Sequence, residues 1–361
     1  MALQGASRRA LYWADDSFRE AHRVIREAIS TLVAGESLDR AQAAGSMDQI
    51  MRGEATPAQV AAFIVALRMK GESVDEIVGL AETMRLHSLR VPVSGALIDT
   101  CGTGGDRSGS INISTTAALI VAGAGGRVAK HGNRSVSSHS GSADVLEALG
   151  VRIDLGPGAV ARCIEGAGVG FMFAQVFHPS MRHAGGVRRE IGVRTVFNVL
   201  GPLTNPAGAQ HQVVGVADDA LLAPMIQALQ RLGSRHALVV HADDGLDEIS
   251  LSGPTRVAEL RDGSVAQFTI APEQFGYGRV APEAIRGGDA AENARVLRAV
   301  LDGVGGPARD VAVLNAGAAL YAGDLAPDLH AGIVAAERAI DSGAARRALA
   351  SFVSLSQAGI E

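Results

Sequence analysis

After Val91-Pro92, short apolar runs alternate with helical segments, and this alternation constrains the fold more than any other feature of the chain. Five runs have the length of a strand and are bounded by glycine or polar residues: LIDT, GRVAK, GVGFMFA, HQVVGVA and HALVVHA. Segments with helical patterning, such as SADVLEALG and DALLAPMIQALQRLG, lie between them. Such alternation predicts a mainly parallel sheet with crossover helices. Ligands of these sheets bind at the carboxyl ends of the strands, where this sequence has its glycine-rich and polar loops.

The segment before this alternation, residues 16–90, indicates helices with little strand signal. Two motifs, TPAQ and SVDE, each place Thr or Ser three residues before Gln or Glu, which is the pattern of a helix capping box. Apolar residues then recur at helical spacing: Val60, Phe63, Ile64 and Leu67 after the first motif, and Ile77, Leu80, Ala81 and Met84 after the second. We therefore expect a small α-helical domain at 1–95 and a larger α/β domain at 96–361, with the segment 178–205 running between them.

Composition excludes several classes of protein. The chain has 361 residues, of which 47% are hydrophobic, enough for two domains with their own cores. A net charge of −5 without a long basic run argues against a protein whose main task is to bind the nucleic-acid backbone. Two cysteines make neither a disulfide framework nor a metal knuckle. Because the N-terminus lacks an apolar export signal and no apolar run approaches the ~20 residues of a membrane span, we expect a cytoplasmic protein without a membrane or nucleic-acid partner.

The stretch CGTGGDRSGSINISTT, which follows the first predicted strand, combines four glycines with six hydroxyl side chains. Glycines in GTGGD, at 102–106, let successive backbone amides face one anion, and Ser114 and Thr115 add hydroxyls at the start of a helix. Asp106 suits a sugar hydroxyl or a metal-bound water better than an anion. The alternative is a glycine-rich turn followed by an ordinary helix cap. The spacing matches neither of the two common phosphate motifs, GxxxxGK[ST] and GxGxxG.

The second polar stretch, KHGNRSVSSHSGSAD, follows the strand-like GRVA. Lys130 and Arg134 supply positive charge, Asn133 supplies both a donor and an acceptor, and the serines add further donors. This set at a strand end predicts a site for a polyanion. The alternative is a solvated polar loop, in which His131 or His139 is an ordinary loop histidine.

Two further stretches carry charged side chains. HPSMRHAGGVRREIGVRTVFNVLGPLTNPA places four arginines on or near one helix, and one inward-facing guanidinium would orient an organic acid while the other three are solvated. Gly201-Pro202 forms part of a rigid loop that would shape a pocket wall. In DGLDEIS, Asp247 and Glu248 are either surface charges or, beside phosphate loops, a pair that holds Mg²⁺ together with substrate phosphates.

Together these blocks resemble the anthranilate phosphoribosyltransferase family. The resemblance runs from GEATPAQVAAFIVALRMKGE through GTGGD, KHGNRSVSS and NVLGPLTNPA to DGLDEIS, and the order and spacing of the blocks are its most specific feature. It implies a fold shared with the pyrimidine nucleoside phosphorylases: a small α domain, an α/β domain with a mainly parallel sheet, and an active site in the cleft between them. It also implies a homodimer formed through the α domain. The implied substrates are phosphoribosyl pyrophosphate and anthranilate, with Mg²⁺, two ions per active site.

The resemblance also implies roles for individual residues. Phosphoribosyl pyrophosphate would be bound by Gly102, Thr103, Gly104, Gly105, Asp106, Asn112, Ser114, Thr115, Lys130, Asn133 and Ser142. Anthranilate would be bound by Gly102, His131, Asn133, His178, Arg188, Gly201 and Pro202, with Arg188 meeting its carboxylate. The metal ligands would be Ser114, Asp247 and Glu248. Lys130 and Arg188 would serve catalysis by neutralising charge, and His131 is a candidate base.

The implied reaction does not require a strong base, because the amine of anthranilate is an aniline and is already neutral at pH 7. The demanding step is instead the departure of pyrophosphate from the ribose, which calls for electrostatic stabilisation. A pyrimidine nucleoside phosphorylase on the same fold is the nearest rival, but it uses inorganic phosphate and has less need of a carboxylate pair. A nucleic-acid-binding relative without activity would show a basic surface and eroded loops, and this sequence shows neither.

Overall fold

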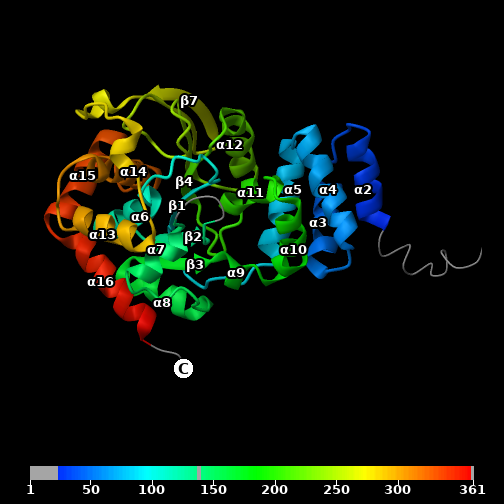
Figure 1. The fold of residues 1–361 in the computed structure, drawn as a ribbon, viewed down its shortest axis with the longest axis horizontal. Coiled ribbons are helices and arrows are strands. Elements are labelled where there is room, and N and C mark those ends of the chain that lie inside the picture. The colour runs from blue at the N-terminus through cyan, green and yellow to red at the C-terminus, as the bar shows by residue number, and fades with distance from the viewer. Residues whose placement is uncertain (1–22, 136–139, 359–361) are drawn as a thin grey trace, which may run out of the picture.

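The computed structural model describes residues 23–135 and 140–358, and it has a helical bundle at one end and an α/β body at the other (Figure 1). The bundle consists of α2 (Arg23–Val33), α3 (Arg40–Arg52), α4 (Pro57–Lys70) and α5 (Val74–Leu86). Both predicted capping boxes are present, at the starts of α4 and α5, and the side chains of both predicted stripes are buried. Residues 1–22 of the predicted helical domain, and His139 in the second polar stretch, lie outside the described residues.

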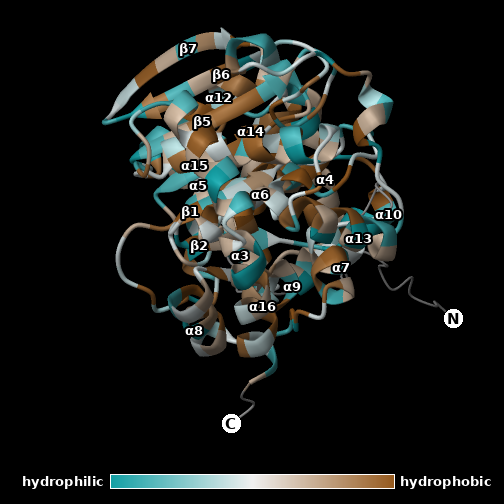
Figure 2. Cartoon of the chain, turned by 90° about the vertical axis from the view of Figure 1, so that its left-hand side faces the viewer, coloured by the Kyte–Doolittle hydropathy of each residue, from teal (hydrophilic) through white to brown (hydrophobic). Residues whose placement is uncertain are grey.

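The body contains a seven-stranded sheet in the order β3-β2-β1-β4-β5-β6-β7. The first five strands are parallel, and they are the five predicted runs: β1 (Ile98–Gly102), β2 (Val128–Gly132), β3 (Val169–Phe173), β4 (His211–Gly215) and β5 (His236–Ala242). Two strands that were not predicted, β6 (Thr255–Arg261) and β7 (Ser264–Ile270), extend the sheet in antiparallel pairing. Figure 2 shows these two strands arching over one edge of the molecule. The predicted fold class, a helical part with a mainly parallel α/β part, is confirmed.

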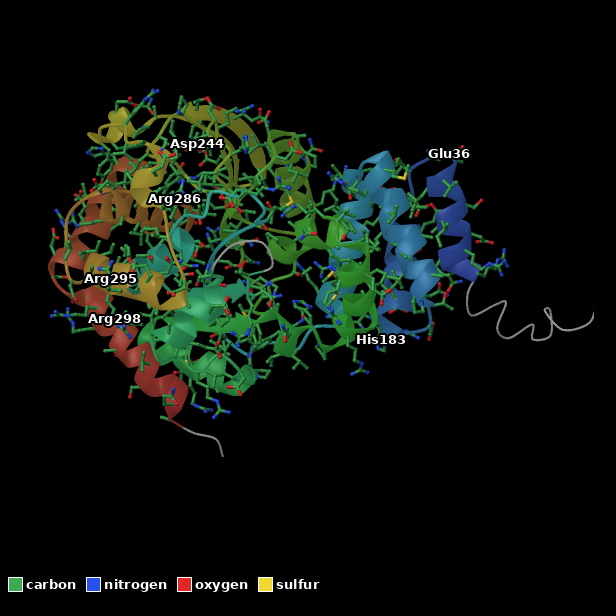
Figure 3. All side chains as sticks on the ribbon, in the orientation of Figure 1. Glu36, His183, Asp244, Arg286, Arg295 and Arg298 are labelled. Carbon is green, nitrogen blue, oxygen red and sulfur yellow. The ribbon has the colours of Figure 1, made fainter. Side chains whose placement is uncertain are left out.

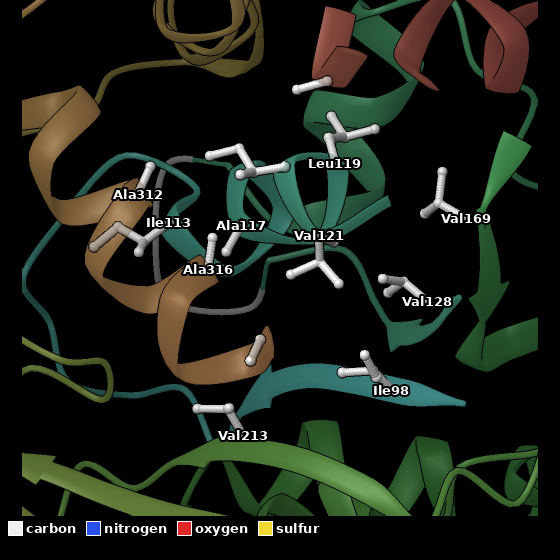
Figure 4. Packing of buried hydrophobic residues seen from close by; sticks show 14 of the residues in the cluster. Ile98, Ile113, Ala117, Leu119, Val121, Val128, Val169, Val213, Ala312 and Ala316 are labelled. Carbon is white, nitrogen blue, oxygen red and sulfur yellow. The ribbon is translucent and has the colours of Figure 1, made fainter. Parts of the chain in front are cut away.

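Helices cover both faces of the sheet. On one face, α6 (Ile113–Gly123) and α14 (Pro307–Ala322) pack against the strands, and Figure 4 shows their side chains meeting Ile98, Val128 and Val213. The remaining helices of the body are α7 (Ser142–Ala148), α8 (Pro157–Ala167), α9 (Ala174–Phe177), α12 (Leu222–Arg231), α13 (Ala290–Leu301), α15 (Leu329–Asp341) and α16 (Ala344–Gln357). Among the described residues, none of the helices is both long and apolar enough to cross a bilayer.

The bundle shares its hydrophobic core with the other face of the sheet. Two helices from the 178–205 segment, α10 (Arg182–Ile191) and α11 (Val196–Leu200), pack against α3, α4 and α5, and α12 packs against α5 as well as the strands. Buried apolar residues therefore run without interruption from the bundle through α12 to the β4 residue Val214 and the β5 residue Val239. The domain boundary at residue 95 remains a prediction.

Candidate active site

The glycine-rich loop after β1 lies against the carboxylate of Asp247. Gly104 and Gly105 have φ values of +62° and +85°, which favour glycine, and the Gly104 amide donates to Asp247 Oδ2 over 2.7 Å. A Cβ on Gly102 would stand 2.4 Å from the same oxygen. These glycines are therefore needed for the close approach of a carboxylate, and not only for exposing amides to an anion.

The start of α6 is tied to three other segments. The Ser114 amide donates to Glu248 Oε1 over 3.1 Å, and its hydroxyl accepts from Lys130 Nζ over 3.2 Å. Asn112 does not cap α6 with its side chain; its Nδ2 donates to the Ser140 carbonyl, and its Oδ1 accepts from Asn293 Nδ2 over 2.9 Å. Thus Asn112 and Ser114 of the first stretch, Lys130 of the second and Glu248 of the last come together at the start of α6. Thr115, from the same predicted set, is buried.

Asp247 and Glu248 are consecutive residues in the loop that follows β5. Burial raises the pKa of Asp247, and the neighbouring Asp106 raises it further. Burial and the charge of Asp247 likewise raise the pKa of Glu248, while Lys130 partly opposes this shift. Two carboxylates that resist ionisation at close range are suited to a divalent cation, which would remove their repulsion.

A metal ion at this pair would depend on ligands from outside the protein. In the described part of the chain, no group of three His, Cys, Asp or Glu side chains is arranged to hold a metal. Mg²⁺ commonly binds one or two carboxylates and completes its octahedron with water and substrate phosphates. The donor set of Asp247, Glu248 and the Ser114 hydroxyl therefore fits Mg²⁺ better than Zn²⁺.

Lys130 belongs to a buried polar network that the sequence analysis did not identify. Its ammonium group donates to the Thr100 carbonyl as well as to Ser114. Asp99 is fully buried beside it and accepts from the His131 amide over 3.2 Å and from Asn205 Nδ2 over 2.7 Å. Burial raises the pKa of Asp99, and the charge of Lys130 opposes that shift. The network holds the ends of β1 and β2 in register at the site.

His131 and His178 form a neutral, desolvated wall. Their ring centroids lie 5.0 Å apart, and burial lowers the pKa of His131 to about 3 and that of His178 to about 4. His131 Nδ1 lies 3.1 Å from the Gly201 carbonyl, which only accepts, so the proton sits on Nδ1. Nε2 of each ring is buried without a hydrogen-bond partner among the described residues. His131 is thus a weak base at neutral pH, with a free acceptor for a ligand N–H.

Of the four arginines in the 178–205 segment, Arg188 is partly buried and Arg194 contacts the glycine-rich loop. Arg188 on α10 stacks over the ring of Phe197 at 5.0 Å, and its burial lowers its pKa. Arg194 is exposed, as expected, but its guanidinium also donates to the Thr103 carbonyl over 3.0 Å and lies against Gly105. Arg182 and Arg189 are exposed, as expected.

In the described part of the loop after β2, several polar groups are bonded within the protein. Asn133 accepts the Arg134 amide with its side chain and the Ser142 hydroxyl with its carbonyl, over 2.8 and 3.2 Å. Arg134, expected to supply charge to a ligand, instead pairs with Asp144 and Glu147 on α7. Gly201 and Pro202 form a short 3₁₀ turn whose first carbonyl meets His131, as described above.

Comparisons with known proteins agree with this geometry. Residues 94–346 match the glycosyl transferase family, a/b domain, and residues 26–88 match the glycosyl transferase family, helical bundle domain. Anthranilate phosphoribosyltransferase from Thioalkalivibrio sulfidiphilus is 59% identical over 331 residues, which are 91% of this chain and 98% of that protein. The protein of the same name from Chloroflexus aggregans is 56% identical over 92% of this chain and 98% of its own length.

The chain belongs to the anthranilate phosphoribosyltransferase family. The resemblance found in the motifs is therefore confirmed. The crystal structure of anthranilate phosphoribosyltransferase from Thermus thermophilus superposes with a TM-score of 0.87 at 45% identity, covering 92% of this chain and 99% of that one. The Saccharomyces cerevisiae anthranilate phosphoribosyltransferase in complex with phosphoribosyl pyrophosphate and Mg superposes at 0.86 with 26% identity, covering 94% and 100%.

Within this anthranilate phosphoribosyltransferase fold, sequence reasoning missed several site residues. Asp99, Arg194 and Asn293 contact predicted site residues directly. Asn205 contacts Asp99, and Asn315 contacts Ile249, the residue after Glu248. Asp99 had a visible signal, because it is a polar residue inside the apolar run ALIDT. Asn293 and Asn315 likewise stand in helices whose neighbouring residues are mostly apolar, but nothing in the sequence pairs them with partners 181 and 66 residues away.

Proposed function

We infer that the protein transfers the phosphoribosyl group of phosphoribosyl pyrophosphate to the amine of anthranilate, giving N-(5-phosphoribosyl)anthranilate and pyrophosphate. This is the second step of tryptophan biosynthesis from chorismate. The observation that carries the inference is 59% identity to an anthranilate phosphoribosyltransferase over almost the whole of both chains. The enzyme is accordingly a glycosyltransferase that works with Mg²⁺, as in the yeast relative solved with phosphoribosyl pyrophosphate and Mg.

We propose that the phosphoribosyl pyrophosphate binds between the loop after β1, the start of α6 and Lys130. The convergence of Ser114, Lys130 and the carboxylate pair supports this placement. Mg²⁺ would be held by Ser114, Asp247 and Glu248, and two ions per site remain the expectation. When bound, the metal supplies positive charge that stabilises the departing pyrophosphate. Lys130, fixed by its bond to the Thr100 carbonyl, adds a second, immobile positive charge on the same side.

We propose that anthranilate binds between Arg188 and the histidine wall. The guanidinium of Arg188 is desolvated, and no carboxylate among the described residues forms an ion pair with it. It would therefore be able to form an ion pair with the carboxylate of anthranilate. The free Nε2 of His131 would accept an N–H of the aniline and orient its lone pair. A yeast relative has been solved in complex with 4-fluoroanthranilate, which supports a dedicated site for this acid.

A homodimer through the helical bundle and a cytoplasmic location remain predictions. Exposed apolar side chains on the bundle, Val33 on α2 and Met69 on α4, support the first of these.

The decisive test of function is a loss of anthranilate fluorescence when phosphoribosyl pyrophosphate is added, with and without Mg²⁺. Loss that requires both phosphoribosyl pyrophosphate and Mg²⁺ would support the assignment. Consumption of pyrimidine nucleoside with inorganic phosphate, without any effect on anthranilate, would favour the phosphorylase alternative instead.

A further inference from the structure

The carboxylate pair is held between two segments that are distant in sequence. On one side, the main chain of Asp247 presses on Gly215 at the end of β4, where a Cβ would stand 1.6 Å from the Asp247 carbonyl oxygen. The loop after β5, which carries Asp247 and Glu248, is shaped at its start by Asp244, which is labelled in Figure 3. The Asp244 carboxylate accepts from Leu246 N over 3.1 Å and from Ser250 Oγ over 2.6 Å. On the other side the loop reaches α14, and there a single side chain holds it.

That side chain is Asn315. Its Oδ1 accepts the Ile249 amide over 2.9 Å, and its Nδ2 donates to the Ile249 carbonyl over 2.9 Å. The two bonds engage both polar groups of one residue's main chain, as a neighbouring strand would. Nδ2 also donates to the Val311 carbonyl of its own helix over 2.9 Å, so both polar atoms of the buried amide are engaged.

An asparagine at this buried position lowers the stability of the fold unless its amide forms hydrogen bonds. Every residue from Val311 to Ala322 of α14 is buried, and Asn315 stands among alanine, leucine and valine in that stretch. Burying an amide is tolerated only when its hydrogen bonds are made, and here two of the three reach the residue next to Glu248. The bonds to Ile249 lie outside the hydrogen bonding of the helix itself, and they tie the main chain next to Glu248 to α14.

We infer that Asn315 is a positioning residue for the metal-binding pair. By clamping Ile249, it fixes the direction in which Glu248 leaves the main chain, and so it holds the Glu248 carboxylate beside Ser114 and next to Asp247. This inference rests on the proposed function of Asp247 and Glu248 as Mg²⁺ ligands. Groups that orient metal ligands commonly change metal affinity 10- to 100-fold when they are removed.

The test replaces the amide and measures metal binding apart from turnover. Asn315→Leu keeps the size of the side chain and removes both bonds to Ile249, and Asn315→Ser is a second variant that removes the same bonds with a smaller change in polarity. Leu314→Ala, on the same buried helix turn, is the matched control because it lowers stability and leaves in place the side chain that bonds Ile249. Each protein is titrated with Mn²⁺ alone, with free Mn²⁺ read by electron paramagnetic resonance, and Asp247→Asn identifies the binding that depends on the pair.

We expect the Asn315 variants to bind Mn²⁺ at least ~10-fold more weakly than wild type, and their half-saturating Mg²⁺ concentration in the fluorescence assay to rise similarly. The KM for anthranilate should change less than twofold, and Leu314→Ala should keep wild-type Mn²⁺ affinity. Unchanged affinity in both Asn315 variants, or an equal loss in Leu314→Ala, would overturn the inference. Wild-type turnover reports separately on the proposed function, so the two failures are distinguishable.

Discussion

The Gly215→Ala substitution tests the architecture of the site most directly. Gly215 is the last residue of β4 and pairs with Gly102 of β1, and its carbonyl accepts the Thr103 amide over 2.9 Å. An added Cβ would lie 1.6 Å from the Asp247 carbonyl oxygen and 2.3 Å from its carbon. Because real Cβ contacts are not shorter than 3.0 Å, the two segments must separate by about 1.4 Å, the difference between 3.0 and 1.6 Å.

A displacement of that size at a catalytic group is severe. Misplacement by about 1 Å costs on the order of 10²-fold in rate, which corresponds to about 2.7 kcal/mol in activation free energy. We therefore expect kcat/KM for phosphoribosyl pyrophosphate to fall about 100-fold and the half-saturating Mg²⁺ concentration to rise. The KM for anthranilate should change little, because Arg188 and His131 lie on other elements. Overpacking should also lower the free energy of unfolding by about 1–3 kcal/mol.

The assay is the fluorescence measurement at varied Mg²⁺, phosphoribosyl pyrophosphate and anthranilate, with thermal unfolding followed in parallel. Gly278→Ala is the matched control, because Gly278 is exposed and a Cβ there meets nothing within 4 Å. A folded Gly215→Ala protein whose kcat/KM and Mg²⁺ dependence stay within threefold of wild type would refute the idea that the position of Asp247 limits turnover.

Three further outcomes follow from the charges of the site. Arg188→Ala should raise the KM for anthranilate far more than that for phosphoribosyl pyrophosphate in steady-state kinetics. Equal effects on the two KM values would contradict the proposal that Arg188 binds the carboxylate of anthranilate. Without Mg²⁺, wild type should lose stability as the pH rises above the usual pKa values of 3.8 and 4.5 toward the raised pKa values of Asp247 and Glu248. The double variant Asp247→Asn with Glu248→Gln should lack that loss, so it should melt higher than wild type at pH 8 with chelator and should show no stabilisation by Mg²⁺; a wild-type-like melting profile would contradict this. His131 and His178 have lowered pKa values, so their contribution to stability is complete above 6.5 and is lost as the pH falls toward about 3 and 4, by about 1.4 kcal/mol per pH unit for each ring. Urea unfolding of His131→Asn between pH 6.5 and 4.5 should show a correspondingly shallower decline, and an unchanged slope would count against a buried neutral His131.

Local signals predicted much of the fold. The capping boxes TPAQ and SVDE formed as expected, because capping depends on side chains three residues apart. The strands β6 and β7 were missed, although they are joined by Asp262-Gly263, a turn pair in which both residues have positive φ. That Asp-Gly pair is a strong hairpin signal. The strand after it is mostly exposed, so its apolar pattern is weak.

Physical reasoning from the sequence alone predicted less of the site than of the fold. Glycine loops and charged residues at strand ends pointed to an anion site, and the family resemblance assigned the roles. Asn293 and Asn315 could not be found this way, because each acts through a partner that only the folded topology brings near. Arg194 was missed for a related reason: its spacing from Arg188 gives no hint that the chain turns it back onto Gly105.

The strand order also determines when the site becomes complete during synthesis. β1 lies between β2 and β4, so its second neighbour is made only after the chain has passed residue 211. Until then β1 is an edge strand, with unpaired amides and carbonyls that another chain would pair with. The carboxylate pair appears later still, and α14, which clamps it, emerges near the end of translation. The nascent protein therefore carries the glycine-rich loop after β1 on an open sheet edge for much of its synthesis, the interval in which chaperones protect folding chains.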